Sequence, residues 1–142
     1  MKMRYVKLDD RAITPTYGST DAAGADLYAL DSAVIFSGET KLIHTGIAVE
    51  IPHGYVGLIY ARSGLATKRG LAPANKVGVI DSDYRGELMV SLYNQSGKTE
   101  SINRGERIAQ LVITPFLQVE YELSDDLSSS ERGAGGFGST GK

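Results

Sequence analysis

The sequence contains no cysteine, so neither a disulfide framework nor a thiolate nucleophile is available to this protein. No apolar run approaches the roughly 18 residues that a membrane span needs, and the first ten residues have no apolar core of the kind found in signal peptides. The net charge of −2 argues against a surface that coats nucleic acid. We therefore expect a cytoplasmic protein with no membrane or nucleic-acid partner.

Glycine, by contrast, is abundant, at 17 of 142 residues, or about 12% against an average near 7%. This excess indicates tight turns, and hence a β-rich fold or ligand-binding loops. The length suits a single domain, which at this size buries roughly two thirds of its unfolded surface. The chain is therefore long enough to form a core of its own.

Short stretches of alternating apolar and polar residues recur along the chain and predict β-strands. In the clearest one Leu88, Val90 and Leu92 alternate with polar or larger residues. The other predicted strands cover residues 34–36, 42–51, 55–60, 77–80, 108–113 and 116–123. Turn signals between them, such as Asn103-Arg104-Gly105, favour an antiparallel sandwich or barrel.

One short helix is predicted over residues 63–69, with Ser63 as its N-cap and Gly70 as its stop. Residues 123–130 are polar and acidic and are typical of a linker. The tail beyond them matches the dinucleotide pattern G-x-G-x-x-G at 133–138 and the P-loop pattern G-x-x-x-x-G-K at 136–142. Both patterns require a helix after the loop, and none is expected here, so the tail is predicted to bind anions only with help from another scaffold.

Two carboxylates, Asp81 and Asp83, mark the segment with the densest chemistry. A calcium loop starting at Asp81 is excluded, because Arg85 and Leu92 occupy its fifth and twelfth positions, where oxygen ligands belong. Two interpretations remain open from the residues alone. The acids are either solvated turn residues or a pair directed at one ion.

A second candidate segment is Arg62-Ser63-Gly64, which lacks the flanking glycines of a nucleophile elbow. It is either a helix cap beside a surface charge or an anion site made of N–H groups, a hydroxyl and a guanidinium. Asp26 taken alone is most simply a turn acid, and Gln110 carries no signal of its own. The histidines His44 and His53 have no metal-like spacing around them.

The order of these segments is more informative than any one of them. Five motifs follow one another along nearly the whole chain: Gly24-Ala25-Asp26-Leu27, Arg62-Ser63-Gly64-Leu65-Ala66, Gly78-Val79-Ile80-Asp81-Ser82-Asp83-Tyr84-Arg85-Gly86, Gly105-Glu106-Arg107-Ile108-Ala109-Gln110-Leu111 and Arg132-Gly133-Ala134-Gly135-Gly136-Phe137-Gly138-Ser139. Together they resemble the five motifs of the homotrimeric deoxyuridine triphosphatase (dUTPase) family. One departure is Ala61, where the family usually has proline, and it removes no functional group.

The resemblance implies an all-β, jelly-roll-like subunit with one short helix and a flexible glycine-rich C-terminal arm. It places the catalytic domain at residues 1–123, and the linker and mobile arm at 124–142. It further implies a homotrimer with shared active sites. The implied reaction is magnesium-dependent hydrolysis of dUTP to dUMP and pyrophosphate, which keeps uracil out of DNA and supplies dUMP for thymidylate synthesis.

The resemblance also implies roles for the matching positions. Asp81 is expected to activate the attacking water, and Asp26 to serve Mg²⁺ indirectly, through bound water. The remaining positions are expected to contact substrate: uracil through Asn75, Gly78, Val79 and Ile80; deoxyribose through Tyr84; phosphates through Arg62, Ser63 and Gly64; a phosphate or the attacking water through Gln110; and the bound nucleotide through the arm residues Arg132, Phe137, Gly138 and Ser139.

Two other functions stay open at the level of sequence. A dCTP deaminase shares the fold and takes a deoxynucleotide, although the segment around Asp81 favours uracil recognition and hydrolysis. A regulatory module with dUTP as its switch is the second alternative, although no insertion in the sequence suggests a surface for a protein partner.

Overall fold

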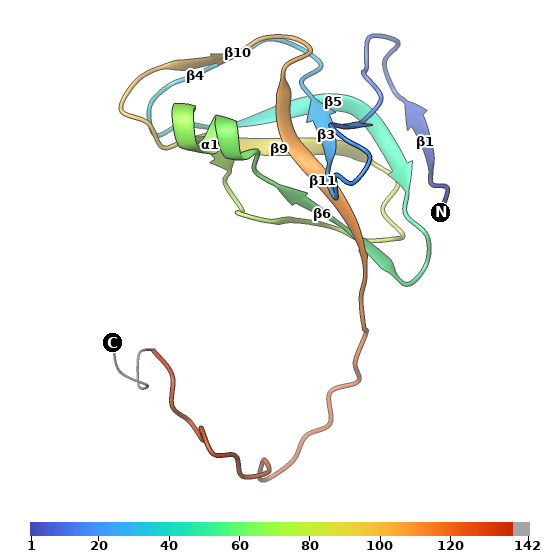
Figure 1. Cartoon of the computed structure of the whole chain (residues 1–142), viewed down its shortest axis with the longest axis vertical. Coiled ribbons are helices and arrows are strands. Elements are labelled where there is room, and N and C mark those ends of the chain that lie inside the picture. Colours follow the sequence, from blue (N-terminus) through green and yellow to red (C-terminus); the bar gives the residue numbers. More distant parts are fainter. Residues whose placement is uncertain (138–142) are drawn as a thin grey trace.

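The structure, a computed structural model, describes residues 1–137 and is built on antiparallel β-sheets (Figure 1). One sheet has the order β1 (Arg4–Lys7), β5 (Thr40–Glu50), β9 (Glu87–Asn94), β7 (Leu71–Pro73). The other large sheet has the order β2 (Thr16–Tyr17), β3 (Ala25–Tyr28), β11 (Arg107–Pro115), β6 (Tyr55–Tyr60), β8 (Gly78–Ile80). A small pair joins β10 (Glu100–Ile102) to β4 (Ala33–Ile35). The predicted all-β class is confirmed.

The alternating pattern of β9 shows why these segments form strands. Leu88, Val90 and Leu92 are buried at every second position, while the residues between them are half-buried. They join one apolar cluster with Leu27 of β3 and Leu111 of β11, so the core lies between the two large sheets. Burying apolar side chains from both sheets supplies most of the driving force for folding.

A bulge interrupts the pairing of β5 with β9 between His44 and Ala48. Gly46 lies within it at a φ of 70°, a left-handed conformation that glycine adopts at no steric cost. The carboxylate of Glu87, the first residue of β9, binds the backbone of this bulge, and Glu87 also lines a pocket described below. Glu87 Oε1 accepts hydrogen bonds from the backbone N–H of Thr45 at 3.1 Å and of Gly46 at 2.7 Å.

The helix α1 (Ser63–Arg69) has the predicted bounds. Gly70 ends it in the left-handed conformation, at a φ of 66°, and its N–H donates to the carbonyl of Ala66, as in an αL cap. The predicted N-cap is wrong, because Arg62 occupies that position in an extended conformation and makes no side-chain capping bond. The Arg62 side chain turns instead to Asp26 of β3.

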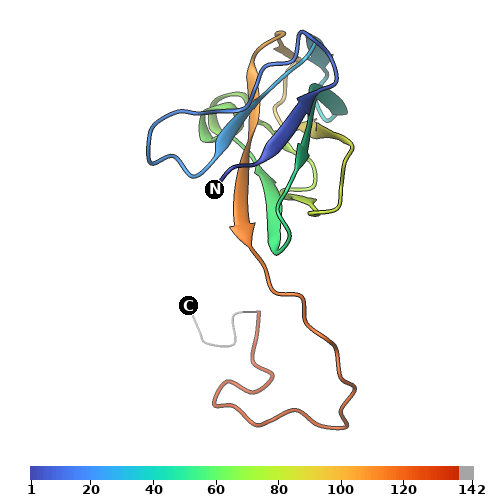
Figure 2. The ribbon, with the colours of Figure 1, turned by 90° about the vertical axis from the view of Figure 1, so that its right-hand side faces the viewer.

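The strand predicted over residues 116–123 is also wrong. β11 ends at Pro115, and no regular element follows in the described part of the chain. Figures 1 and 2 show the segment after β11 running away from the sheets, where Leu117, Tyr121 and Leu123 are more than 90% exposed. The alternating pattern is present, but no neighbouring strand offers the hydrogen bonds that a strand needs.

Over residues 1–137 the structure has no helix that is long and apolar enough to cross a membrane.

Candidate functional site

A cavity of about 220 Å³ contains one of the two groups of predicted site residues. We call it the Asp26 pocket, and its lining is Gly18, Ala22, Gly24, Asp26, Arg62, Ser63, Gly64 and Gln110. Three elements meet here: β3 supplies Asp26, the start of α1 supplies the Arg62–Gly64 segment, and β11 supplies Gln110. Asp26 and Gln110, which carry little signal when taken alone, are brought together because β11 pairs with β3 and places Gln110 opposite Asp26.

The Asp26 carboxylate is buried and paired with two cations. Its Oδ1 accepts from Arg62 Nε at 2.7 Å, and its Oδ2 accepts from Arg107 Nη1 at 3.3 Å. The interpretation as a turn acid is therefore wrong, since Asp26 lies inside β3 at 8% exposure. One carboxylate between two guanidinium groups leaves a net positive charge beside the hydroxyl of Ser63, and such a site attracts an anion.

Gln110 is fixed within the same pocket by two contacts. Its Nε2 donates to the carbonyl of Ala61 at 2.9 Å, and its side chain lies against Gly24. A Cβ at Gly24 would approach Gln110 Cβ at 3.1 Å and the amide oxygen more closely still. Gly24 therefore provides the space for the Gln110 amide. The Ala61 position needs only a backbone carbonyl for this contact, so the absence of the usual proline leaves it intact.

Arg107 does not line the pocket but contacts its Asp26 carboxylate, and the sequence did not single it out. It opens β11, and a register shift between Arg107 and Ala109 accompanies its contact with Asp26. Its position in the motif Gly105-Glu106-Arg107 is the one sequence feature that could have marked Arg107 as a site residue. The partner 81 residues away in sequence is visible only in the folded chain.

A second cavity, of about 280 Å³, contains the other group of predicted residues. We call it the Asp81 pocket, and its lining is Leu42, Val79, Ile80, Asp81, Tyr84, Glu87 and Met89. Asp81 and Tyr84 are exposed on its rim. The pocket is richer in apolar groups than the Asp26 pocket, so its chemistry suits a ligand with an apolar face beside the exposed Asp81 carboxylate.

The segment 81–86 crosses between the sheets and is not the tip of a two-stranded hairpin. β8 before it pairs with β6, and β9 after it pairs with β5 and β7. The crossing begins with a turn in which the Tyr84 N–H donates to the Asp81 carbonyl at 3.1 Å. Since each end is held by a different sheet, the position of Asp81 depends on how the sheets pack.

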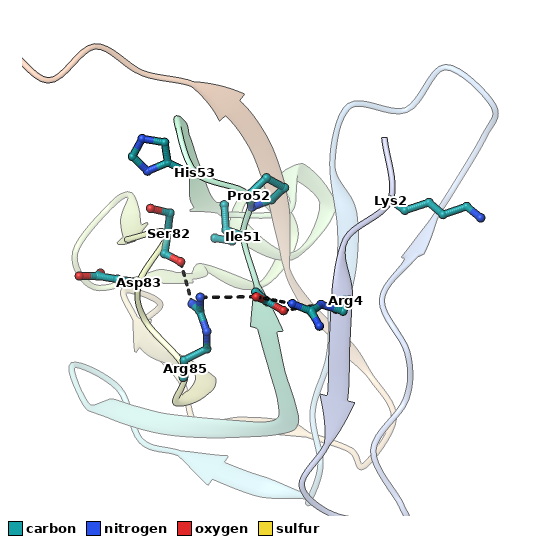
Figure 3. A pocket seen from close by; sticks show the side chains of 9 residues that line it. Lys2, Arg4, Ile51, Pro52, His53, Ser82, Asp83 and Arg85 are labelled. Atoms are coloured by element: carbon teal, nitrogen blue, oxygen red, sulfur yellow. Dashed lines mark hydrogen bonds and ion pairs between the residues drawn. The ribbon is translucent and has the colours of Figure 1, made fainter.

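Arg85 holds this crossing segment through a backbone contact and also lines a further cavity of about 460 Å³ (Figure 3). Its Nη1 donates to the Ser82 carbonyl at 2.7 Å, and its Nη2 lies 3.8 Å from Glu50. Glu50 is in turn paired with Arg4 of β1 at 2.6 Å. Arg85 therefore stabilises the turn through the Ser82 carbonyl.

Asn75 and Gly78 lie beside one another at the start of β8. A Cβ on Gly78 would lie 3.4 Å from Asn75 Nδ2 and 3.2 Å from Ile59 Cβ, so Gly78 permits a close approach of both. Between them Lys76 takes a φ of 65°, the left-handed conformation that non-glycine residues adopt rarely. Asn75 is exposed and does not line the Asp81 pocket.

The two arm residues that the structure describes, Arg132 and Phe137, line neither pocket. Arg132 Nε donates to the carbonyl of Gly135 at 2.7 Å, and the Phe137 ring is fully exposed. Gly138 and Ser139 lie outside the described residues.

The side chains present fit a magnesium ion only in a limited way. Residues 1–137 contain no group of three or more histidine, cysteine, aspartate or glutamate side chains able to hold a metal, which leaves no all-protein cage in that range. Mg²⁺ commonly keeps several waters and is held by one or two carboxylates together with ligand phosphates. Both oxygens of Asp26 already accept from arginines, so this single carboxylate would fit such a site only indirectly, through a bound water.

Sequence comparison gives a consistent family for these motifs. A family model described as dUTPase matches residues 10–141. The deoxyuridine 5'-triphosphate nucleotidohydrolase of Nautilia profundicola is 51% identical over 142 residues, covering 100% of both chains. The enzyme of the same name from Desulfitobacterium hafniense is 49% identical, covering 99% of this chain and 95% of its own.

Solved structures agree with this result. A mutant dUTPase of Staphylococcus bacteriophage 80alpha, with dUpNHpp, superposes with a TM-score of 0.93 at 31% identity, and 99% of each chain is covered. A mutant dUTPase from phage phi11 of S. aureus, reported to coordinate a structural Mg(II) ion, superposes with a TM-score of 0.82 at 28% identity. That match covers 89% of this chain and 98% of the phage chain.

Proposed function

The chain belongs to the dUTPase family, and we propose that it hydrolyses dUTP to dUMP and pyrophosphate. The observation that carries the proposal is the presence of two half-sites of complementary chemistry, one cationic around Asp26 and one apolar around Asp81. A triphosphate suits the first and a uracil with its deoxyribose suits the second. In the cell, this activity keeps uracil out of DNA and supplies dUMP for thymidylate synthesis.

In the proposed reaction Asp81 is the general base. Its carboxylate is exposed at the rim of the Asp81 pocket, where it holds a water molecule for in-line attack on the α-phosphorus. As water attacks, its proton passes to Asp81 and the bond from the α-phosphorus to the bridging oxygen breaks, releasing pyrophosphate. A positioned carboxylate typically contributes about 10²–10⁴-fold, and phosphoryl-type transfer otherwise depends on positioning and charge stabilisation.

The cationic half-site binds the phosphates. Arg62, Ser63 and Gly64 offer a guanidinium, a hydroxyl and the first N–H groups of α1, which have no partner within the helix. Gln110 is directed at the same space and contacts a phosphate or the water. When bound, Mg²⁺ would neutralise part of the triphosphate charge, and Asp26 would hold it indirectly through water. Asp26 also keeps Arg62 extended toward the pocket through the 2.7 Å ion pair.

The apolar half-site selects the nucleoside. Uracil has two acceptors and one donor on its pairing edge, which alternating backbone N–H and C=O groups of Gly78–Ile80 and the amide of Asn75 can match. Val79 and Ile80 line the Asp81 pocket, whereas Asn75 and Gly78 lie outside its lining, so we propose that the base extends beyond the pocket to reach them. Cytosine would leave buried groups unpaired, at a cost of about 1–3 kcal/mol each. The Tyr84 ring lies under the deoxyribose and leaves no room for a 2′-hydroxyl, which excludes UTP.

We further propose that the working enzyme is a homotrimer with shared sites. The two pockets of one subunit, about 220 and 280 Å³, have no lining residue in common. Each lies below the roughly 300–1,000 Å³ of ordinary small-molecule sites. Joining the Asp26 pocket of one copy to the Asp81 pocket of another would give a site large enough for a nucleoside triphosphate.

The C-terminal segment is proposed to close this site. Residues 1–123 form the catalytic domain and 124–142 the linker and mobile arm. Arg132 would contact the terminal phosphate, Phe137 would stack on uracil, and Gly138 and Ser139 would contact the nucleotide. Among the described residues the Phe137 ring is fully exposed, which supports this role, because an exposed aromatic side chain gains from covering a ligand.

A pyrophosphate-release assay against dUTP, UTP, dCTP and dTTP, with and without magnesium, tests the proposal. We expect turnover of dUTP alone, and only with magnesium present. Ammonia release from dCTP would replace the proposal with a deaminase. Absence of turnover on dUTP by the trimer would refute it.

A further inference from the structure

We infer that Gly86 is a specificity-determining residue, because it forms the seat that holds the Tyr84 ring in place. The inference rests on the proposed function, in which this ring excludes the 2′-hydroxyl. It adds the requirement for glycine at position 86, which is separate from the contact between the ring and the sugar. Discrimination depends on a residue that touches no substrate.

The evidence is the packing of the Tyr84 ring directly over the Gly86 backbone. A Cβ placed on Gly86 would lie 2.5 Å from Tyr84 Cζ and 2.9 Å from Cε2, and closer still to the hydroxyl oxygen. Carbon atoms in proteins do not approach so closely without one of them moving. Gly86 is not among the glycines with positive φ, so the requirement for glycine comes from the ring and not from the backbone conformation.

The ring is held on this seat at its far end. The Tyr84 hydroxyl donates to the carbonyl of Glu87 at 3.0 Å, one residue beyond Gly86. Glu87 is itself fixed, because its carboxylate accepts from the N–H of Thr45 and Gly46 and faces His44 Nδ1 at 2.8 Å. The seat is therefore joined to the bulge of β5 and moves with the core sheet.

A methyl group at position 86 would displace the ring and spare the fold. Tyr84 is 40% exposed, and the atoms in conflict are at the end of its side chain, so rotation about its side-chain bonds relieves the clash. Rotation also breaks the bond to the Glu87 carbonyl. The displaced ring would no longer exclude the 2′-hydroxyl, so a ribonucleotide could bind.

The test compares Gly86→Ala with Gly97→Ala, a matched control. An added Cβ at Gly97 meets no atom within 4 Å, and Gly97 is likewise absent from the positive-φ glycines. We expect Gly86→Ala to raise the ratio of kcat/KM for UTP to that for dUTP about tenfold, the scale on which a single misfit group changes selectivity. The control should keep the wild-type ratio. An unchanged ratio in Gly86→Ala would overturn the inference.

A double-mutant cycle separates this mechanism from a general effect on the turn. In a Tyr84→Ala background, Gly86→Ala should change the ratio by less than about twofold, because the partner through which it acts is gone. A further tenfold change there would contradict a role through Tyr84.

The geometry is also measurable without activity. Nuclear Overhauser effects between the Gly86 α-protons and the Tyr84 ring should be present in wild type, and their absence would overturn the seat. If they are present and wild type prefers dUTP, an unaltered ratio in Gly86→Ala removes only the specificity role. If wild type fails to hydrolyse dUTP, the proposed function falls and the specificity role falls with it.

Discussion

At the level of single residues, Asp26 and Asp81 have the same side chain but very different surroundings. Asp26 is 8% exposed and paired with two arginines, while Asp81 is exposed on the rim of an apolar pocket. Both oxygens of Asp26 already accept hydrogen bonds from guanidinium groups. Asp26 therefore positions the two arginines, and the role of general base stays a proposal for Asp81.

Asp81→Asn should separate binding from turnover. The amide retains the size of the carboxylate but accepts no proton, so we expect kcat to fall about 10²–10⁴-fold while the affinity for dUTP stays within a few-fold. Asp83→Asn, an exposed acid in the same turn, is the control and should stay near wild type. Pyrophosphate release and calorimetric titration measure the two quantities. Near-normal turnover in Asp81→Asn would remove its role.

Asp26→Ala should cost stability as well as activity. It leaves Arg62 and Arg107 with an uncompensated charge, and losing one partner of a buried pair costs about 3–5 kcal/mol. Since Arg107 is 50% exposed, water offsets part of this, and we expect a loss of about 2 kcal/mol. Urea unfolding of the variant beside wild type measures it. A loss below about 0.5 kcal/mol would show that the two arginines do not need Asp26.

Among the secondary-structure elements, α1 connects the Asp26 pocket to the rest of the fold. Its start carries Ser63 and Gly64, and its last residue, Arg69, donates through Nε to Glu100 of β10 at 2.7 Å. Arg69 also bonds Glu106 and the carbonyl of Ser101. One guanidinium thus ties the helix to β10 and to the turn before β11.

This tie predicts a pH dependence of stability. The hydrogen bond from Arg69 lowers the pKa of the Glu100 carboxyl below its ordinary 4.5, against the opposing effect of burial. A pKa that is depressed on folding contributes stability above about pH 4.5, and this contribution is lost as the pH falls through the folded-state pKa. We expect the free energy of unfolding to decrease from about pH 5 downward.

Urea unfolding across this range, in wild type and in Glu100→Gln, measures the contribution. The variant should show a shallower decline, with Glu120→Gln in the exposed tail as control. A residual decline remains expected, since a hydrogen bond from Arg11 lowers the pKa of Asp9 to about 2. Equal slopes in wild type and Glu100→Gln would contradict the tie.

At the scale of the whole molecule, the unpaired tail and the divided site point to assembly. Apolar side chains on the β-rich body, including Val79 at 63% and Leu42 at 52% exposure, line or flank the Asp81 pocket and suit contact with another copy. We expect sedimentation velocity to give a trimer. A monomer at micromolar concentration would contradict the shared-site proposal.

Deleting the residues after Ser130 should leave the trimer and its unfolding transition intact, because the described part of this segment makes no contact with the core cluster. Turnover of dUTP should nevertheless fall by most of its value, since the residues proposed to close the site are removed. An active truncation would show that the arm is dispensable.

Local patterns were enough to predict much of this fold. Alternation over residues 55–60 predicts β6 at its observed bounds, and the glycine at position 70 predicts the end of α1, because both are properties of consecutive residues. The order of five motifs likewise predicted the family from sequence alone.

Contacts between residues that lie far apart in the chain could not be predicted from local patterns. The Arg62 side chain pairs with Asp26 of β3. Residues 116–123 form no strand, and the segment 81–86 connects one large sheet to the other. The reason is physical. Backbone preference and hydrophobic period act over a few residues, whereas ion pairs, sheet order and the Tyr84 seat depend on which distant surfaces are buried together.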